Sequence, residues 1–290
     1  MIAAIGRWWF SPLPRGRVAA LRTILYLFIF VDVFVTTRWV AMHGAVPGDL
    51  YQPLFIGELL RLPTPGPLFV PVVQALLLAS AAIAATGRLP RAAGTAVALL
   101  YAQWMFIAFS YGKVDHDRVA FLVALAVLPT VGAARWGDRG ADAASGWAIR
   151  SIQVAAVATY FLSVFAKFRF GGLRWLNSAS MMRAVVRRGT WFGDLLRPYP
   201  VVLRASQYLI VGFEFLSPLL LVGGRVTIVM LVACVVFHAV TFAAVKIFFL
   251  PHVMCLLAFL PLERIDPRAA LELLRRSRSR LVSQRGGAEL

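Results

Sequence analysis

The sequence predicts an all-α fold, a polytopic integral membrane bundle of about eight transmembrane helices. Two observations support this prediction. The chain of 290 residues is 60% hydrophobic, and its apolar residues form several long runs separated by segments rich in Pro, Gly and Arg. An apolar helix of about twenty residues rises about 30 Å, the thickness of the hydrocarbon core of a bilayer. We therefore expect the lipid bilayer to surround most of the chain.

The expected spans follow from the apolar runs taken in order. The first covers residues 18–36 and contains Arg22 and Asp32; because it is long and no small-residue cleavage site follows, we expect an uncleaved anchor. A loop rich in Pro and Gly occupies residues 38–67, with a short amphipathic piece at 54–62. The other expected spans cover residues 68–86, 92–112, 119–134, 149–167, 207–222, 226–245 and 247–262.

Charge distribution predicts the orientation of the chain. Eight spans place both termini on one side, which carries a small excess of Lys and Arg, and the positive-inside rule makes that side cytoplasmic. We expect residues 1–17 to form a cytoplasmic segment, 18–263 the transmembrane domain and 264–290 a basic cytoplasmic tail, in the plasma membrane of a bacterium. The net charge of +17 lies in loops, where anionic lipid accounts for it, so no nucleic acid partner is expected.

The stretch YFLSVFAKFRFGGLRWLNSASMM, which begins at Tyr160, organises the functional hypothesis. Lys167 ends the fifth expected span and therefore lies near a membrane face. Tyr160 precedes it by almost two helical turns, so both side chains lie on one stripe of the helix. Gly171 and Gly172 are expected to end this helix. The Arg- and Trp-containing segment that follows predicts an amphipathic segment lying in the interface and covering the site.

Ionisable residues gather on the outer side of the expected bundle. Their depth follows from the rise of about 1.5 Å per helical residue, which places Asp32, Glu214 and His238 about 10 Å below the outer face. Charged groups at such depth cost several kcal/mol unless they pair or contact water, so their convergence indicates a functional site. Lysine, unlike arginine, can lose its proton when desolvated. The same side also holds Lys113, Asp115, His116, Asp117, Lys167, Lys246 and His252.

Each candidate also has a structural interpretation. Lys167 could extend to the lipid headgroups, as lysines at helix ends commonly do. His238 could be an interhelical hydrogen-bonding group, and His116 with Asp117 could simply begin the next helix. The four histidines lack the spacing of metal ligands, so no metal is expected. The two cysteines lie in apolar runs without a C-x-x-C pair, and no disulfide-exchange centre is predicted.

Three stretches together resemble one known family. They are the Lys167 stretch, VDHDRVAFLVALAVLP from Val114, and VVFHAVTFAAVKIFFLPHVMCLLAFLP from Val235, and GFEFLSPLLL around Glu214 fits the same pattern. In order and spacing they resemble the horizontally transferred transmembrane (HTTM) domain family, which includes the membrane part of the vitamin K-dependent gamma-carboxylase. The resemblance covers residues from about 18 to 263, the whole expected transmembrane domain.

This resemblance implies a quinol-dependent enzyme. Lys167 would be the base that deprotonates a reduced quinone, vitamin K hydroquinone or menaquinol, and His116 and His238 would orient or stabilise the resulting anion. In the carboxylase, oxygenation of the quinol by molecular oxygen drives proton removal from the acceptor, to which carbon dioxide adds. The residues implied to bind substrate are Tyr160, Trp175, Glu214 and Asp117.

Two departures from the family pattern leave the acceptor open. The carboxylase grips its protein substrate with a large lumenal portion, whereas this sequence continues only shortly beyond the last expected span. Lys246 also stands where the family often has small residues. Peptide carboxylation as such is therefore not expected. A smaller substrate, a protein partner that supplies substrate recognition, and a retained fold without the chemistry all stay open.

Two other function classes compete with the enzyme. In the first, the protein is a non-catalytic membrane partner or maturation factor whose polar residues only hold the bundle together. In the second, it is a transporter that uses Asp32, Glu214 and His238 as a proton relay. A pocket shared by Lys167 and His238 would favour the enzyme. A Lys167 side chain directed to lipid would favour the partner, and a continuous polar path to the inner face would favour the transporter.

Overall fold

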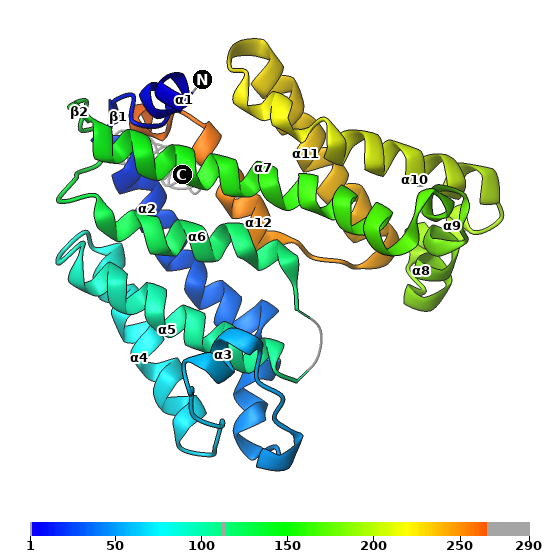
Figure 1. Ribbon diagram of the computed structural model, residues 1–290, viewed down its shortest axis with the longest axis horizontal. Helices are drawn as coiled ribbons and strands as arrows, with labels where there is room; N and C mark the ends of the chain where they lie inside the picture. Colours follow the sequence, from blue (N-terminus) through cyan, green and yellow to red (C-terminus); the bar gives the residue numbers. More distant parts are fainter. Residues whose placement is uncertain (1, 112–113, 266–290) are drawn as a thin grey trace, which may run out of the picture.

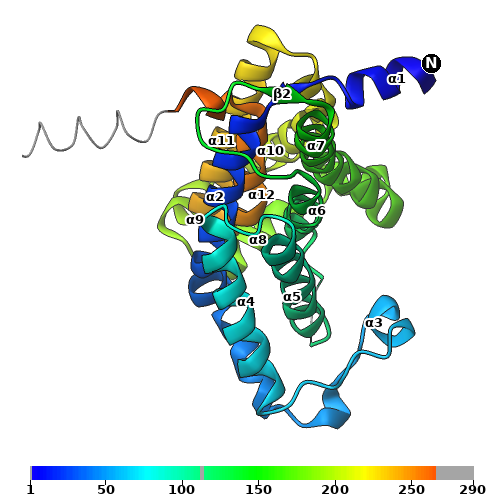
Figure 2. The ribbon, with the colours of Figure 1, turned by 90° about the vertical axis from the view of Figure 1, so that its left-hand side faces the viewer.

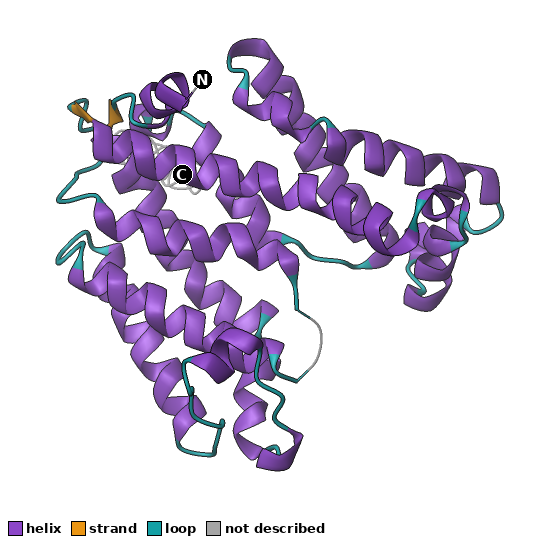
Figure 3. Cartoon of the chain, in the orientation of Figure 1, coloured by secondary structure: helices purple, strands orange, loops and turns teal. Residues whose placement is uncertain are grey.

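The computed structural model describes residues 2–111 and 114–265, and these are mostly helical (Figures 1 and 3). The prediction of an all-α fold is therefore confirmed. The two short strands, β1 (Leu13–Pro14) and β2 (Ala141–Asp142), form one antiparallel pair. Lys113 and the basic tail beyond residue 265 lie outside the described residues.

The α-helices account for most of the chain. In order they are α1 (Ile2–Trp9), α2 (Arg15–Val31), α3 (Phe55–Leu59), α4 (Phe69–Ala85), α5 (Ala92–Phe109), α6 (Val119–Val127), α7 (Ala143–Gly171), α8 (Ser180–Arg188), α9 (Trp191–Leu196), α10 (Pro200–Phe215), α11 (Gly224–Val245) and α12 (Leu250–Cys255). A π-helical turn, Asp32–Thr36, extends α2. Short 3-10 helices occupy Arg38–Ala45, Gly48–Leu50, His116–Arg118, Leu128–Thr130, Leu173–Asn177, Ser217–Leu221, Leu256–Phe259 and Leu262–Arg264.

Within the described residues, four helices are long and apolar enough to cross a membrane. They cover Arg15–Thr36, Ala92–Phe109, Ala143–Gly171 and Gly224–Val245. Two apolar helices, Phe69–Ala85 and Leu250–Phe259, are shorter. The structure thus supports a helical protein with several membrane-length helices, fewer than the eight full-length spans expected.

The helix expected over residues 119–134 is shorter than the apolar run. It ends at Val127, followed by a 3-10 turn that contains Pro129. Proline has no backbone N–H and disfavours continuation of the helix. The Arg22 guanidinium donates to the carbonyl oxygens of Leu128 and Val131 at 3.0 and 2.8 Å. Carbonyl groups left without a backbone partner at the end of the helix are thus hydrogen-bonded by a side chain. An arginine from α2 therefore completes the end of this segment.

The expected spans at 207–222 and 247–262 also differ from the observed helices. Lys246 adopts a left-handed conformation (φ 50°) that ends α11, and Pro251 lies in the first turn of α12, so the helix covers 250–259 rather than 247–262. The span expected at 207–222 instead begins at Pro200, where proline suits the first turn, and continues beyond Phe215 as a 3-10 turn. Local backbone chemistry sets each of these ends.

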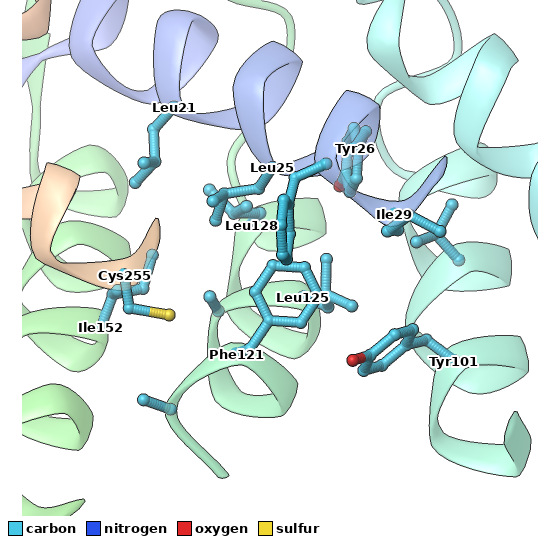
Figure 4. Close-up of a cluster of buried hydrophobic side chains, with 14 of the residues drawn as sticks. Leu21, Leu25, Tyr26, Ile29, Tyr101, Phe121, Leu125, Leu128, Ile152 and Cys255 are labelled. Carbon is cyan, nitrogen blue, oxygen red and sulfur yellow. The ribbon is translucent and has the colours of Figure 1, made fainter. Parts of the chain in front are cut away.

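The core lies between α2, α4, α5, α6, α7 and α12. Figure 4 shows side chains of α2, including Leu25 and Ile29, directed toward Phe121 and Leu125 of α6. α10 packs against α7, and Figure 2 shows α10 and α11 away from α4 and α5. Only 28% of the apolar stretch of α11 is buried within the chain, so most of that helix presents apolar side chains outward. Such a surface suits lipid.

The segment after Lys167 forms a helical cover over one end of the bundle. It comprises α8 and α9, which pack on α10 and on the end of α11 around a small core of Val185, Leu203, Ala244 and Val245. Thr190 caps α9 by accepting a hydrogen bond from Gly193 N, and its hydroxyl donates to the Ala244 carbonyl at 2.8 Å. The cover is thus fixed to the bundle by hydrogen bonds and apolar contacts.

Candidate functional site

A small niche, of about 30 Å³, lies where α7, α10, α11, α12 and the 3-10 turn before α6 meet. Five of the seven site residues predicted from the sequence line it. The lining residues are His116, Asp117, Thr159, Tyr160, Ser163, Glu214, Phe237, His238, Phe249 and His252. Segments separated by more than one hundred residues are therefore brought to one point.

Tyr160 and His238 form the centre of the niche. Tyr160 Oη and His238 Nε2 are 2.6 Å apart, with the donor set by the ring tautomer. The ring of His252 packs edge-on against Tyr160, at 4.4 Å between centroids, and its side chain is 1% exposed. His238 Nδ1 and both ring nitrogens of His252 have no hydrogen-bond partner among the described residues. Buried polar atoms without partners are costly, so the niche retains capacity to bind polar groups.

Lys167 joins the niche through Glu214. Its ammonium donates to Glu214 Oε2 at 2.5 Å and to Ser163 Oγ at 2.7 Å, and Ser163 also donates to Glu214 Oε1 at 3.2 Å. Ser163 lies four residues before Lys167, one helical turn along the same face of α7. The two charged side chains are 17% and 7% exposed, so Lys167 is directed inward and not to the headgroups. The niche therefore ends at a buried ion pair.

Trp175 covers the ion pair from outside. The Lys167 ammonium lies 5.5 Å from the centre of the Trp175 ring, within the range of a cation–π contact. The close return of the chain depends on Gly171, where a Cβ atom would lie 3.0 Å from the Trp175 side chain, and on Gly172 at φ 58°. The predicted glycine break thus brings the predicted tryptophan over the predicted lysine.

A wider cavity, of about 650 Å³, opens beside the niche beneath the cover. His116 and Asp117 line both, and Arg188 of α8 and Lys246 add two cations to the wider cavity. Burial raises the pKa of Asp117 to about 6. Asp115 also lines this cavity, so its walls carry charges of both signs and suit a polar molecule held between the cover and the bundle.

An apolar groove of about 490 Å³ reaches the niche from the other side. It lies between α6 and α7 and is lined by small and aliphatic side chains, among them Val123, Ala158 and Leu162. His116 and Ser163 line both the groove and the niche. His116 is thus shared by an apolar groove, a small niche and a polar cavity.

Asp32 belongs to a separate network. Its carboxylate accepts from Arg118 Nη1 at 2.6 and 2.8 Å and from Tyr101 Oη at 2.9 Å, and Thr36 Oγ1 also donates to it. The expected group of Asp32, Glu214 and His238 is therefore divided: the last two share the niche, and Asp32 holds α2 to α5 and α6. This arrangement gives Asp32 a structural role at the end of α2.

Three residues with important contacts were not among the predicted site residues. His252 lies in the stretch that carries the family resemblance, and a histidine inside an apolar run was the available signal. Ser163 could have been found from its position one turn before Lys167. Arg118 gave no comparable signal, because its pairing with Asp32 joins residues 86 positions apart.

Comparison with protein-family models, curated proteins and solved structures finds no match to the chain. The resemblance to the HTTM family therefore stays a prediction. Among the described residues, no group of three or more His, Cys, Asp or Glu side chains is arranged to hold a metal ion. The two cysteines, Cys234 and Cys255, are both buried and free.

Proposed function

We propose that this protein is a membrane-embedded, quinol-dependent enzyme of the carboxylase-like kind that its resemblance to the HTTM family implies. The observation that carries the proposal is the convergence of Tyr160, His238 and the Lys167–Glu214 pair on one buried niche. Supporting features are the apolar groove on one side of the niche and the polar cavity on the other. An apolar electron donor and a polar acceptor would thus reach His116 by separate routes.

A hydroxyl group of a reduced quinone would reach the niche, whose volume of about 30 Å³ leaves the ring to the adjoining groove. A quinol has two hydroxyl groups and an apolar body, and His238 Nδ1 and the ring nitrogens of His252 are buried polar atoms without a partner in the described chain. The groove between α6 and α7 would take an apolar tail, with His116 at its inner end. When bound, the quinol would supply the electrons for its own oxygenation, with oxygen and carbon dioxide as further substrates. His116 and His238 would orient its hydroxyl groups.

The Lys167–Glu214 pair would move the proton. The Glu214 carboxylate, 2.5 Å from the Lys167 ammonium, stabilises the charged form of the lysine. Lys167 can therefore accept a proton only after its own proton has passed to Glu214, or after the two side chains have separated. In a site of low polarity, a neutral amine next to a neutral carboxylic acid avoids two buried charges. Ser163, hydrogen-bonded to both, would keep the amine aligned during transfer. We therefore assign the base function to the pair, with Glu214 lining the niche and Lys167 behind it.

We further propose a polytopic membrane topology with both termini on the cytoplasmic side. Contacts at one end of the bundle support it, because they join the beginning of one segment to the end of another. Thr23 near the start of α2 binds Ala85 at the end of α4, and Arg17 binds Glu263 after α12. The shorter α6 and α12 would cross with non-helical ends whose backbone groups are satisfied by protein, as with Arg22.

A second candidate is a non-catalytic membrane partner that retains the fold. The observation in its favour is the same ion pair, which joins α7 to α10 and could serve only to hold them together. The two functions differ in what they require of Lys167. To act as a base, the Lys167 amine must first be neutral, whereas a structural cation need only stay charged.

The variant Lys167→Arg separates these functions. Arginine keeps the charge and can pair with Glu214, but it does not give up its proton. Purified protein would be supplied with reduced menaquinone or vitamin K hydroquinone and labelled bicarbonate, and quinone epoxide and incorporated label would be measured. For a base, we expect Lys167→Arg to lower turnover about 100-fold or more with little change in melting temperature.

The matched control is Arg204→Lys, a conservative exchange at an exposed position of α10, which should keep wild-type turnover. Full activity of Lys167→Arg would remove the base function. If the folded wild-type protein yields neither epoxide nor incorporated label, the enzymatic proposal is wrong and the partner function gains.

A further inference from the structure

A second large cavity, of about 740 Å³, lies at the opposite end of the bundle from Lys167. Its walls are the first turns of α2, the C-terminal end of α4 with the turn that follows, and the loop at 133–138. This is the end of the molecule where β1 and β2 lie in Figure 1, since Gly16 at the start of α2 donates to the Asp138 carbonyl. The cavity is therefore separate from the niche and its two approaches.

Arg22 lies against this cavity as a buried cation without an acidic partner. Its side chain is 1% exposed, and its hydrogen bonds go to the carbonyl oxygens of Leu128, Val131 and Gly132. Among the described residues it makes no ion pair with a carboxylate, and its Nε has no hydrogen-bond partner. A buried charge held only by neutral dipoles is costly, so an anion in the adjoining cavity would stabilise it.

Two further arginines make the cavity strongly positive. Arg88 after α4 and Arg135 in the loop line it and are exposed. The acidic lining residue, Asp138, is already paired with Arg15 at 3.2 Å. The Trp136 indole binds Thr23 Oγ1 at 3.2 Å and fixes the loop against α2. Three guanidinium groups from three segments thus face a space with no uncompensated carboxylate in its described lining.

We propose that this cavity binds a phosphate group, carried by the headgroup of an anionic phospholipid or by a free phosphate ion. Phosphate oxygens accept several hydrogen bonds, and the planar guanidinium donates two in parallel to such an oxyanion. Basic pockets between membrane helices on the cytoplasmic side bind anionic headgroups for this reason. Arg88 and Arg135 would contact the phosphate directly, and Arg22 would contribute its charge from beneath.

Binding is tested on the purified, delipidated full-length protein by the melting temperature, since a ligand of the folded state raises it. The titrants are short-chain phosphatidylglycerol and inorganic phosphate, each against the wild type and the double variant Arg88→Gln/Arg135→Gln. These two positions are exposed, so the variant should fold, unlike a change at Arg22. We expect at least one titrant to stabilise the wild type and the double variant to bind it at least tenfold more weakly.

The matched control is Arg139→Gln, which removes the same charge from an exposed position beyond the lining of the cavity. It should bind as the wild type does. A headgroup site binds phosphatidylglycerol at much lower concentration than phosphate, and a free-ion site shows the reverse order. The proposal is wrong if neither titrant raises the melting temperature, if the double variant binds like the wild type, or if Arg139→Gln weakens binding as much as the double variant.

Discussion

The buried charges of this protein are stabilised in different ways at the level of single residues. Asp32 is surrounded by an arginine and two hydroxyl donors, and Lys167 by a carboxylate and a hydroxyl. Arg22 instead meets only backbone carbonyl oxygens among the described residues. Removing one member of a buried pair leaves an uncompensated charge and costs about 3–5 kcal/mol. Conservative exchanges such as Lys167→Arg are therefore more informative here than truncations.

Acidification should weaken the ion pair between Arg17 of α2 and Glu263, which follows α12. Glu263 accepts from Arg17 at 2.7 and 2.8 Å, and these hydrogen bonds lower the pKa of Glu263. A group whose folded pKa is depressed contributes stability that is complete above its unfolded pKa, about 4.3, and is lost as pH falls through the folded value. We expect Glu263→Gln to lower stability by about 1 kcal/mol at neutral pH. Melting curves of the wild type and Glu263→Gln, recorded from pH 7 to 3, measure this difference in stability.

The difference between wild type and Glu263→Gln should disappear at the acidic end of that series, because the wild-type carboxyl is then protonated too. A difference that persists unchanged at low pH would mean that Glu263 stabilises the fold by packing and not by charge. Glu58→Gln, a change at an exposed residue of α3, serves as the control and should be neutral throughout.

Helix packing depends on small residues where two elements approach closely. At Gly94, near the start of α5, an added Cβ would lie 2.6 Å from Tyr26 Oη of α2 and 2.9 Å from Pro129. Both neighbours are buried, so the clash cannot be relieved by moving into solvent. We expect Gly94→Ala to destabilise the protein by about 1–3 kcal/mol. Gly212→Ala in α10 has no atom within 4 Å of its Cβ, and there alanine should be neutral or stabilising.

These two variants would be compared by melting temperature in the same detergent. An equal response of Gly94→Ala and Gly212→Ala would mean that α5 shifts to accept the methyl group. In that case the contact between α2 and α5 would be looser than the distances indicate.

Hydropathy predicts the long helices well and the short ones poorly. The expected spans at 92–112 and 226–245 agree with α5 and α11 to within three residues at each end. The runs at 119–134 and 247–262 are also apolar, but Pro129 and the left-handed Lys246 shorten their helices. Composition alone does not show that Arg22 satisfies the carbonyl oxygens freed at Pro129, because that contact crosses more than one hundred residues.

The same limit applies to the candidate site. Residue chemistry and helical spacing identified Lys167, Tyr160, Glu214 and His238 as a set on one side of the bundle. Their pairing could not be predicted, because it depends on how α7, α10 and α11 pack. Lys167 was expected to act as a base that loses its proton when desolvated, and the structure pairs its ammonium with Glu214.

As a whole molecule, the bundle has two chemically different ends. One carries the niche with its histidines and its covering helices, and the other carries the arginine-lined cavity beside β1 and β2 (Figure 1). α7 connects them, and its 29 residues rise about 43 Å. A helix of that length exceeds the hydrocarbon thickness, so residues flanking it should lie on opposite sides of a membrane.

Thiol labelling tests that topology. The native cysteines, Cys234 and Cys255, are buried, so the parent protein should react little with a membrane-impermeant maleimide. Arg139→Cys before α7 and Arg174→Cys after it place exposed thiols at the two ends. In intact cells we expect labelling of Arg174→Cys alone, and in inverted vesicles of Arg139→Cys alone. Because α7 carries Lys167 near one end, labelling of both variants from the same side would remove the membrane crossing on which the quinol site depends.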